Sequence, residues 1–162
     1  KGVININSNG SLPTDLECLF DAGLDAVRVS LNSARAEYYT KYYKPRGYSF
    51  KDVLASIRLA GRRGFVSLNY LTMPGFTDST AEFTALKELV GACGVDMIQW
   101  RNLNYDPARY FEEMRTGDEA EGMIGIENEI ALLRKEFPRL RTGYFNPFTP
   151  RAAASRRQRH RG

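Results

Sequence analysis

The sequence has few of the residues on which several kinds of chemistry depend. Its single histidine, His160, lies close to the C-terminus, so the chain can form neither a Ser-His-Asp triad nor a histidine-rich metal site. The two cysteines, Cys18 and Cys93, are far apart and both fall in segments that are expected to be helical. This spacing argues against a disulfide framework and fits a reducing, cytoplasmic location.

Long apolar runs are also missing. No stretch approaches the roughly 18 to 20 apolar residues that a membrane-spanning helix needs, and no basic-then-apolar leader opens the chain. We therefore expect a protein of the cytoplasm with no membrane partner.

Positive charge is concentrated at one end. The formal net charge is +4, but the last twelve residues hold five arginines and no acid: Arg151, Arg156, Arg157, Arg159 and Arg161. Without them the chain is slightly acidic, which argues against a nucleic-acid partner. We expect one domain over residues 1–146 and a disordered basic tail over residues 147–162.

Short β-rich runs alternate with helical segments, a pattern typical of a parallel sheet with crossover helices. Strands are expected at 3–7, 26–32, 65–71 and 97–103, with a last short one at 140–145. Helices are expected at 13–23, from a Ser33 N-cap to Pro45, from Ser49 to Gly64, at 80–93 behind a Ser79–Glu82 capping box, before Met114, and along the stripe Ile126, Ile130, Leu133 and Phe137.

The strands have one apolar and one polar face, because side chains alternate across a strand. The polar positions are Asn5, Asn7, Arg28, Ser30, Asn32, Ser67, Asn69, Gln99 and Arg101. Burying such groups unpaired costs about 1–3 kcal/mol each, so the pattern favours a ligand-filled cavity, with a solvated face of an open sheet as the alternative. Amides and hydroxyls suit a nucleoside, and the arginines suit a carboxylate.

Four segments that follow the strands resemble strands three to six of the radical S-adenosylmethionine (SAM) partial barrel. They are Asn7-Ser8-Asn9-Gly10, Ser30-Leu31-Asn32, Met73-Pro74-Gly75-Phe76-Thr77-Asp78 and Arg101-Asn102-Leu103-Asn104. The resemblance covers residues 1–146 and implies the C-terminal half of a partial (β/α)6 TIM-like barrel with parallel strands and outer helices.

The resemblance also implies roles for single residues. SAM would contact Asn7, Asn9, Ser30, Asn32, Asn69, Met73, Gly75, Asn102 and Leu103, and the substrate would contact Arg28, Gln99 and Arg101. For each of these the alternative is a structural turn or a satisfied interior polar group. No residue of the chain is assigned a catalytic or metal-binding role.

The family's C-x-x-x-C-x-x-C motif, whose thiolates hold a 4Fe-4S cluster, is not in this sequence. Because the chain opens at Lys1 inside an apolar stretch, we expect it to begin mid-fold, with the cluster ligands in a missing N-terminal half and no activity of its own. The intact enzyme would cleave SAM reductively to a 5′-deoxyadenosyl radical that abstracts hydrogen. Its electron donor would be a flavodoxin or ferredoxin, and its substrate would be a small molecule or a peptide.

Two other functions fit less well. A barrel aldolase or isomerase would need a glycine-rich phosphate loop, whereas the late turn here is Asn104-Tyr105-Asp106-Pro107. A nucleic-acid-binding module would need a basic stripe beside its aromatic residues. The tyrosines Tyr38, Tyr39, Tyr42, Tyr43 and Tyr48 are expected either to line a substrate approach or to pack against each other.

Overall fold

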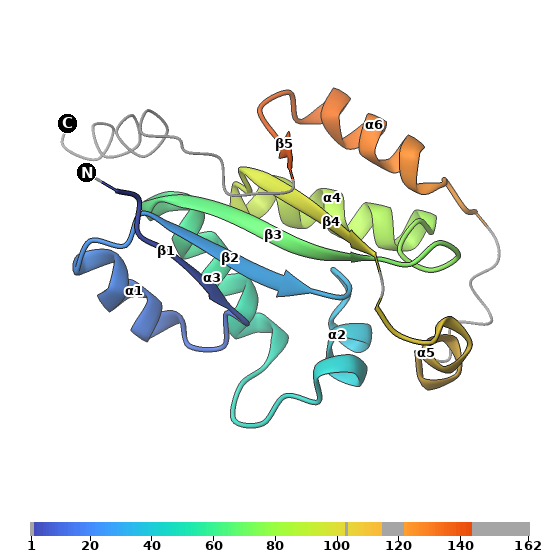
Figure 1. Ribbon diagram of the computed structural model, residues 1–162, viewed down its shortest axis with the longest axis horizontal. Coiled ribbons are helices and arrows are strands. Elements are labelled where there is room, and N and C mark those ends of the chain that lie inside the picture. The colour runs from blue at the N-terminus through green and yellow to red at the C-terminus, as the bar shows by residue number, and fades with distance from the viewer. Residues whose placement is uncertain (1, 103, 115–121, 144–162) are drawn as a thin grey trace.

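A computed structural model describes residues 2–102, 104–114 and 122–143 (Figure 1). All strands are parallel and belong to one sheet in the order β1-β2-β3-β4-β5. Their bounds are β1 (Asn5–Ser8), β2 (Ala26–Leu31), β3 (Phe65–Thr72), β4 (Met97–Asn102) and β5 (Arg141–Thr142). Neighbours in sequence are neighbours in the sheet, and in the described part of the chain β1 and β5 form its two edges. The expected partial barrel is confirmed.

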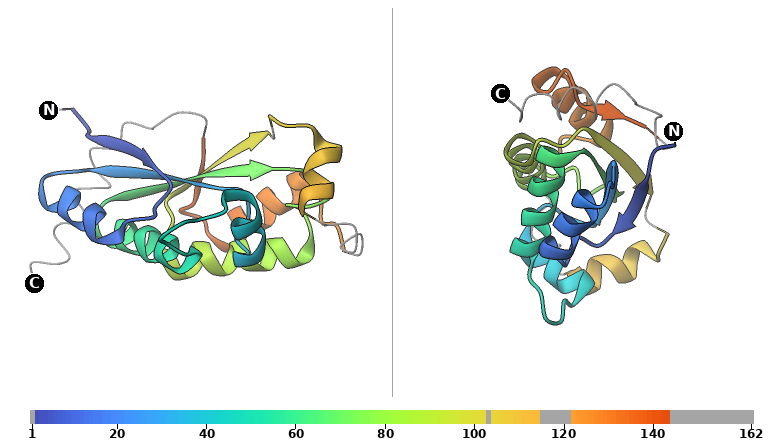
Figure 2. Two further views of the ribbon diagram at one scale, coloured as in Figure 1. Left: turned by 90° about the horizontal axis from the view of Figure 1, so that it is seen from below. Right: turned by 90° about the vertical axis from the view of Figure 1, so that its left-hand side faces the viewer.

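The helices are α1 (Pro13–Asp21), α2 (Ala36–Tyr43), α3 (Phe50–Arg63), α4 (Thr80–Cys93), α5 (Pro107–Met114) and α6 (Ile126–Glu136). Helices α1, α3 and α4 lie side by side on one face of the sheet, while α2 and α5 lie beyond the C-terminal ends of the strands (Figure 2). In the described residues no helix is both long and apolar enough to cross a membrane.

The apolar strand positions form the main core with these helices. Val29 of β2, Leu68 of β3 and Ile98 of β4 are fully buried against Ile57 of α3 and Leu86 of α4. Burial of such side chains stabilises a fold by about 1.5–3 kcal/mol each. The helices therefore cover the apolar face of the sheet, and the polar positions lie on the other face.

Two of the three serines that were predicted to begin helices do so. The Asp52 carboxylate accepts from Ser49 N and Oγ at the start of α3, both at 2.8 Å. Ser79 caps α4 and accepts from Glu82 N at 3.3 Å. Ser33 is not the N-cap of α2, which begins at Ala36 behind Arg35, because the Ser33 hydroxyl donates to the distant Glu82 carboxylate instead.

The later part of the chain agrees with expectation where it is described. Helix α6 ends at Glu136, just before the Phe137-Pro138 pair, and β5 is shorter than the expected strand at 140–145. Leu103, which ends the strand expected at 97–103 and is one of the residues expected to contact SAM, lies outside the described residues, as does the tail over residues 147–162.

Candidate functional site

The polar strand positions meet in two rows across the sheet. The pairing register places Asn7 beside Arg28 and Arg28 beside Ser67. One step toward the C-terminal ends, Ser30 lies beside Asn69 and Asn69 beside Gln99. We call these six residues the polar face. Their expected convergence on one side of the sheet is confirmed, while their roles toward a ligand stay predictions.

The two ends of the polar face differ in chemistry. Toward the N-terminal ends of the strands it borders a small buried apolar cluster of Ala26, Phe65 and Met97. Toward the C-terminal ends the next row pairs Leu71 with the exposed Arg101. A ligand would therefore meet polar groups at the C-terminal ends, where parallel α/β folds bind their ligands.

One amide of the polar face has an unused acceptor. Asn69 Oδ1 is buried and has no hydrogen-bond partner among the described residues. A buried acceptor left unpaired costs about 1–3 kcal/mol. A hydroxyl or amino group of a bound molecule would remove this cost, so the residues present fit a nucleoside.

The charge of Arg101 acts on the guanidinium of Arg28. Burial lowers the pKa of the Arg28 guanidinium, and the charge of Arg101 lowers it further. Two cations in this arrangement produce a positive potential, which suits an anionic group such as a carboxylate.

Asn32 is held by the helices beyond β2. Its Nδ2 donates to the Tyr38 carbonyl at 3.1 Å and to the Tyr110 hydroxyl at 3.4 Å. The buried Oδ1 has no partner among the described residues. Only this acceptor remains for the expected contact with SAM.

The loop after β3 is fixed by its own hydrogen bonds. Gly75 N donates to Asp78 Oδ1 at 2.7 Å, and Met73 N donates to Thr77 Oγ1 at 2.8 Å. Gly75 has a φ of +86°, and a Cβ there would lie 3.3 Å from Phe111 Cζ, so this position favours glycine. Met73 is buried in an aromatic cluster with Phe76. Both residues have a structural role, and their contact with SAM stays a prediction.

The remaining expected residues lie at the rim. Asn9 Oδ1 accepts from Ser11 N at 3.1 Å, and Asn102 is exposed at the end of β4. Most of the tyrosine group packs together: Tyr39 is buried, its ring centroid lies 4.6 Å from that of Tyr43, and its hydroxyl is 3.4 Å from that of Tyr48. These contacts favour aromatic packing over a substrate approach.

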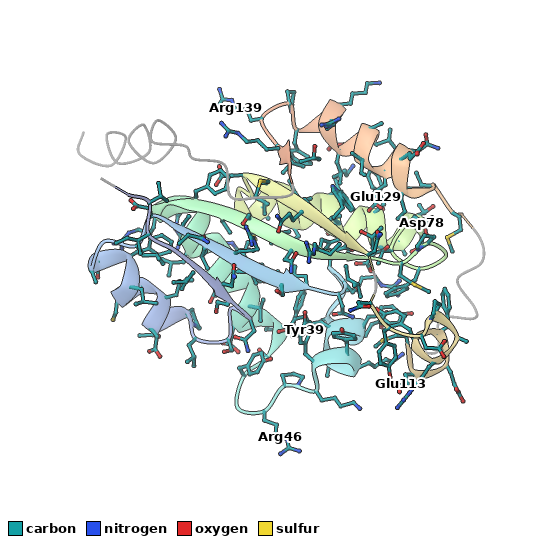
Figure 3. All side chains as sticks on the ribbon, viewed as in Figure 1. Tyr39, Arg46, Asp78, Glu113, Glu129 and Arg139 are labelled. Carbon is teal, nitrogen blue, oxygen red and sulfur yellow. The ribbon has the colours of Figure 1, made fainter. Side chains whose placement is uncertain are left out.

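Two buried carboxyl groups were not predicted from the sequence. Glu82 of α4 and Glu129 of α6 are both fully buried. Burial, followed by the charges of Glu82 and Asp78, raises the pKa of Glu129 to about 8; the labelled Asp78 and Glu129 lie near each other in Figure 3. One signal was available: Glu129 lies three residues after Ile126, on the apolar stripe of its helix.

The described residues do not fit a 4Fe-4S cluster. Among them there is no group of three or more His, Cys, Asp or Glu side chains that could hold a metal ion. Cys18 is exposed on α1, and Cys93 is buried on α4 with its Sγ 3.9 Å from the Leu54 carbonyl. Such clusters are held by several thiolates, which these two positions cannot supply together.

Comparison with known proteins identifies the family. No curated protein matches the chain. The family model described as "Radical SAM superfamily" matches residues 2–86, which is more than half of the 162 residues and runs from before β1 into α4. The match includes Arg28, Ser30 and Asn69 of the polar face and ends before Gln99. The chain belongs to the radical SAM superfamily.

Proposed function

We propose that this chain is the SAM-binding half of the core domain of a radical SAM enzyme. The observation that carries the proposal is the unpaired, buried Asn69 Oδ1 in a row of neutral polar groups near the C-terminal ends of parallel strands. Reductive cleavage of bound SAM supplies the power to abstract a hydrogen atom, and the protein supplies position and shielding.

The neutral groups of the site bind the nucleoside part of the cofactor. Ser30 and Asn69 are half-buried neighbours in adjacent strands, so their hydroxyl and amide groups can bond ribose hydroxyls or a base edge together. Asn7, Asn9, Asn32 and Asn102 extend this set, and Met73 and Gly75 of the loop after β3 lie beside the cofactor.

The charged groups bind the substrate. Arg28 and Arg101, with the buried amide of Gln99 between their rows, form a positive region that suits a carboxylate on a small molecule or a peptide. Fixing the substrate by its charge would leave its apolar part free to face the cofactor.

The 4Fe-4S ligands come from residues outside this sequence, since its two cysteines are an exposed residue of α1 and a buried residue of α4. A flavodoxin or ferredoxin would be the electron donor of the intact enzyme. This arrangement makes the 162-residue chain inactive alone.

The test uses the natural protein that contains this chain, reconstituted anaerobically with iron and sulfide and titrated with SAM by calorimetry. Asn69→Ala should weaken SAM binding about tenfold, as expected for one hydrogen bond to a polar ligand. Asn128→Ala is the control, because Asn128 is an exposed residue of α6 whose Nδ2 donates to the Ile124 carbonyl just before that helix. Absence of SAM binding by the wild type, or equal affinity of the wild type and Asn69→Ala, would overturn the proposal.

The same titration tests whether Arg101 binds the substrate or the cofactor. Arg101→Gln should change SAM affinity by less than about twofold if its guanidinium serves the substrate. A tenfold loss would assign Arg101 to the carboxylate of the cofactor instead, and would remove the argument for an anionic substrate.

A further inference from the structure

The carboxylate of Glu82 connects three separate elements. It belongs to the first turn of α4, and its Oε1 accepts from Ala34 N and from the Tyr70 hydroxyl of β3, both at 2.5 Å. Its Oε2 accepts from Ser33 Oγ at 2.8 Å. The side chain is fully buried, so these donors replace the water that would otherwise solvate it.

Two of the three donors lie in one short segment, residues 32–35, which we call the β2–α2 turn. Ser33 Oγ also accepts from Arg35 N at 3.0 Å, so one hydroxyl joins the turn to itself and to Glu82. The turn begins with Asn32 and directly follows β2, the strand that carries Ser30. Ser30 is placed by strand pairing, whereas the conformation of the turn decides where the Asn32 side chain lies.

The Glu82 side chain accepts hydrogen bonds from three donors. Burial raises the pKa of Glu82, and the bonds from Tyr70, Ala34 and Ser33 and the charge of Arg35 offset only part of this shift. The pKa of Tyr70 lies well above its usual value, so its hydroxyl stays protonated and remains a donor. A carboxylate with several charge-assisted donors holds its partners more firmly than a neutral group would.

We propose that Glu82 is a positioning residue that fixes the β2–α2 turn and thereby sets Asn32 for the nucleoside ligand. This inference rests on the proposed function, because it assigns Glu82 to the same site without contact with the ligand. It predicts that the two hydroxyl donors to Glu82 have different effects. The bond from Ser33 fixes the turn, whereas the bond from Tyr70 only ties α4 to β3.

Ser33→Ala and Tyr70→Phe form a matched pair, since each removes one hydroxyl donor to the same carboxylate. Neither side chain belongs to the polar face, and both hydroxyls bond Glu82, so neither change removes a group that is assigned to a ligand. We expect both variants to melt at a lower temperature than the wild type. Only Ser33→Ala should weaken SAM binding, by about five- to tenfold, while Tyr70→Phe should stay within about twofold.

A second measurement needs no ligand. Hydrogen exchange of the SAM-free protein, followed by mass spectrometry, should become faster in peptides over residues 32–36 for Ser33→Ala and for Glu82→Gln. Tyr70→Phe should leave these peptides near the wild-type rate. Glu82→Gln should also lose SAM affinity, because its amide nitrogen cannot accept a hydrogen bond from Ser33.

The outcomes separate this inference from the proposed function. If the wild type binds SAM and Ser33→Ala binds it equally well, Glu82 does not position the site. Loss of affinity in both matched variants in proportion to their loss of melting temperature would make Glu82 a purely structural residue. If the wild type binds no SAM, the proposed function fails, and exchange in the turn still decides whether Glu82 holds it.

Discussion

Glu129 is a buried carboxyl group of α6 whose two oxygens have no hydrogen-bond partner among the described residues. Burial first, and then the neighbouring acids Glu82 and Asp78, raises its pKa from 4.5 to about 8. Below pH 4.5 the group is protonated in both the folded and the unfolded protein. Between pH 4.5 and 8 the unfolded protein loses this proton first, so the group lowers the free energy of unfolding progressively as the pH rises.

Glu129→Gln should therefore remove most of the decrease in the free energy of unfolding with rising pH. We expect the wild type to lose stability, on the order of a few kcal/mol, from pH 4.5 to 8, and the variant to lose much less. Denaturant unfolding at several pH values measures this. Glu127→Gln, at an exposed position of the same helix, is the control and should keep the wild-type slope. Parallel slopes for wild type and Glu129→Gln would show that Glu129 is not buried as a neutral acid.

The polar face could be predicted from the sequence because it depends only on alternation along each strand. Polar residues alternate with apolar ones along each strand, and strand pairing then brings the polar residues together; these include Arg28, Ser30, Asn69 and Gln99. Glu82 could not be assigned in the same way. Its spacing from Ser79 indicated a capping box, and glutamate is rarely fully buried, so local rules favoured a solvated side chain.

Helices α3 and α4 approach each other closely at a glycine. A Cβ on Gly61 of α3 would lie 2.1 Å from the Cys93 carbonyl oxygen at the end of α4, a distance that requires the helices to move apart. Gly91 of α4 has space, because its Cβ would lie 3.5 Å from the Phe137 ring, which is ordinary contact.

Gly61→Ala should destabilise the protein by about 1–3 kcal/mol, the usual cost of overpacking, despite the better helix propensity of alanine. Gly91→Ala is the matched control and should be neutral or stabilising by up to about 1 kcal/mol. Thermal and denaturant unfolding of both variants compare them. Equal stability of Gly61→Ala and the wild type would contradict the close contact between the two helices.

Element boundaries could be predicted where short-range chemistry sets them. Ser49 and Asp52 lie three residues apart, so the start of α3 was visible in the sequence. The start of α2 was not, because the Ser33 hydroxyl is used by Glu82, which is 49 residues away in the chain. A contact of that range depends on the packing of α4 against the sheet, which no local pattern contains.

At the scale of the whole molecule, the alternation of strands and helices along the sequence predicted the class of fold. The sheet that they form is open. Strand β1 is an edge strand whose only neighbour in the described sheet is β2. In a parallel pair, alternate residues of an edge strand direct their backbone N–H and C=O groups toward the neighbouring strand. The peptide groups of Asn5 and Asn7 therefore point to the open edge. Two apolar side chains directly precede this strand: Val3 is 42% exposed and Ile4 58%. Unpaired backbone groups beside apolar side chains favour association with another strand.

We therefore expect the 162-residue chain on its own to self-associate through β1, with a melting temperature that depends on concentration. Ile4→Lys should reduce this association, because a charged side chain at an edge opposes strand pairing. Leu132→Lys is the matched control: Leu132 on α6 is 42% exposed but lies away from β1, so its replacement should leave association unchanged. Sedimentation velocity over a wide range of concentrations measures both. A monomer with a sharp, concentration-independent melt would show that β1 is a stable edge, and that the sheet needs no further strand beside it.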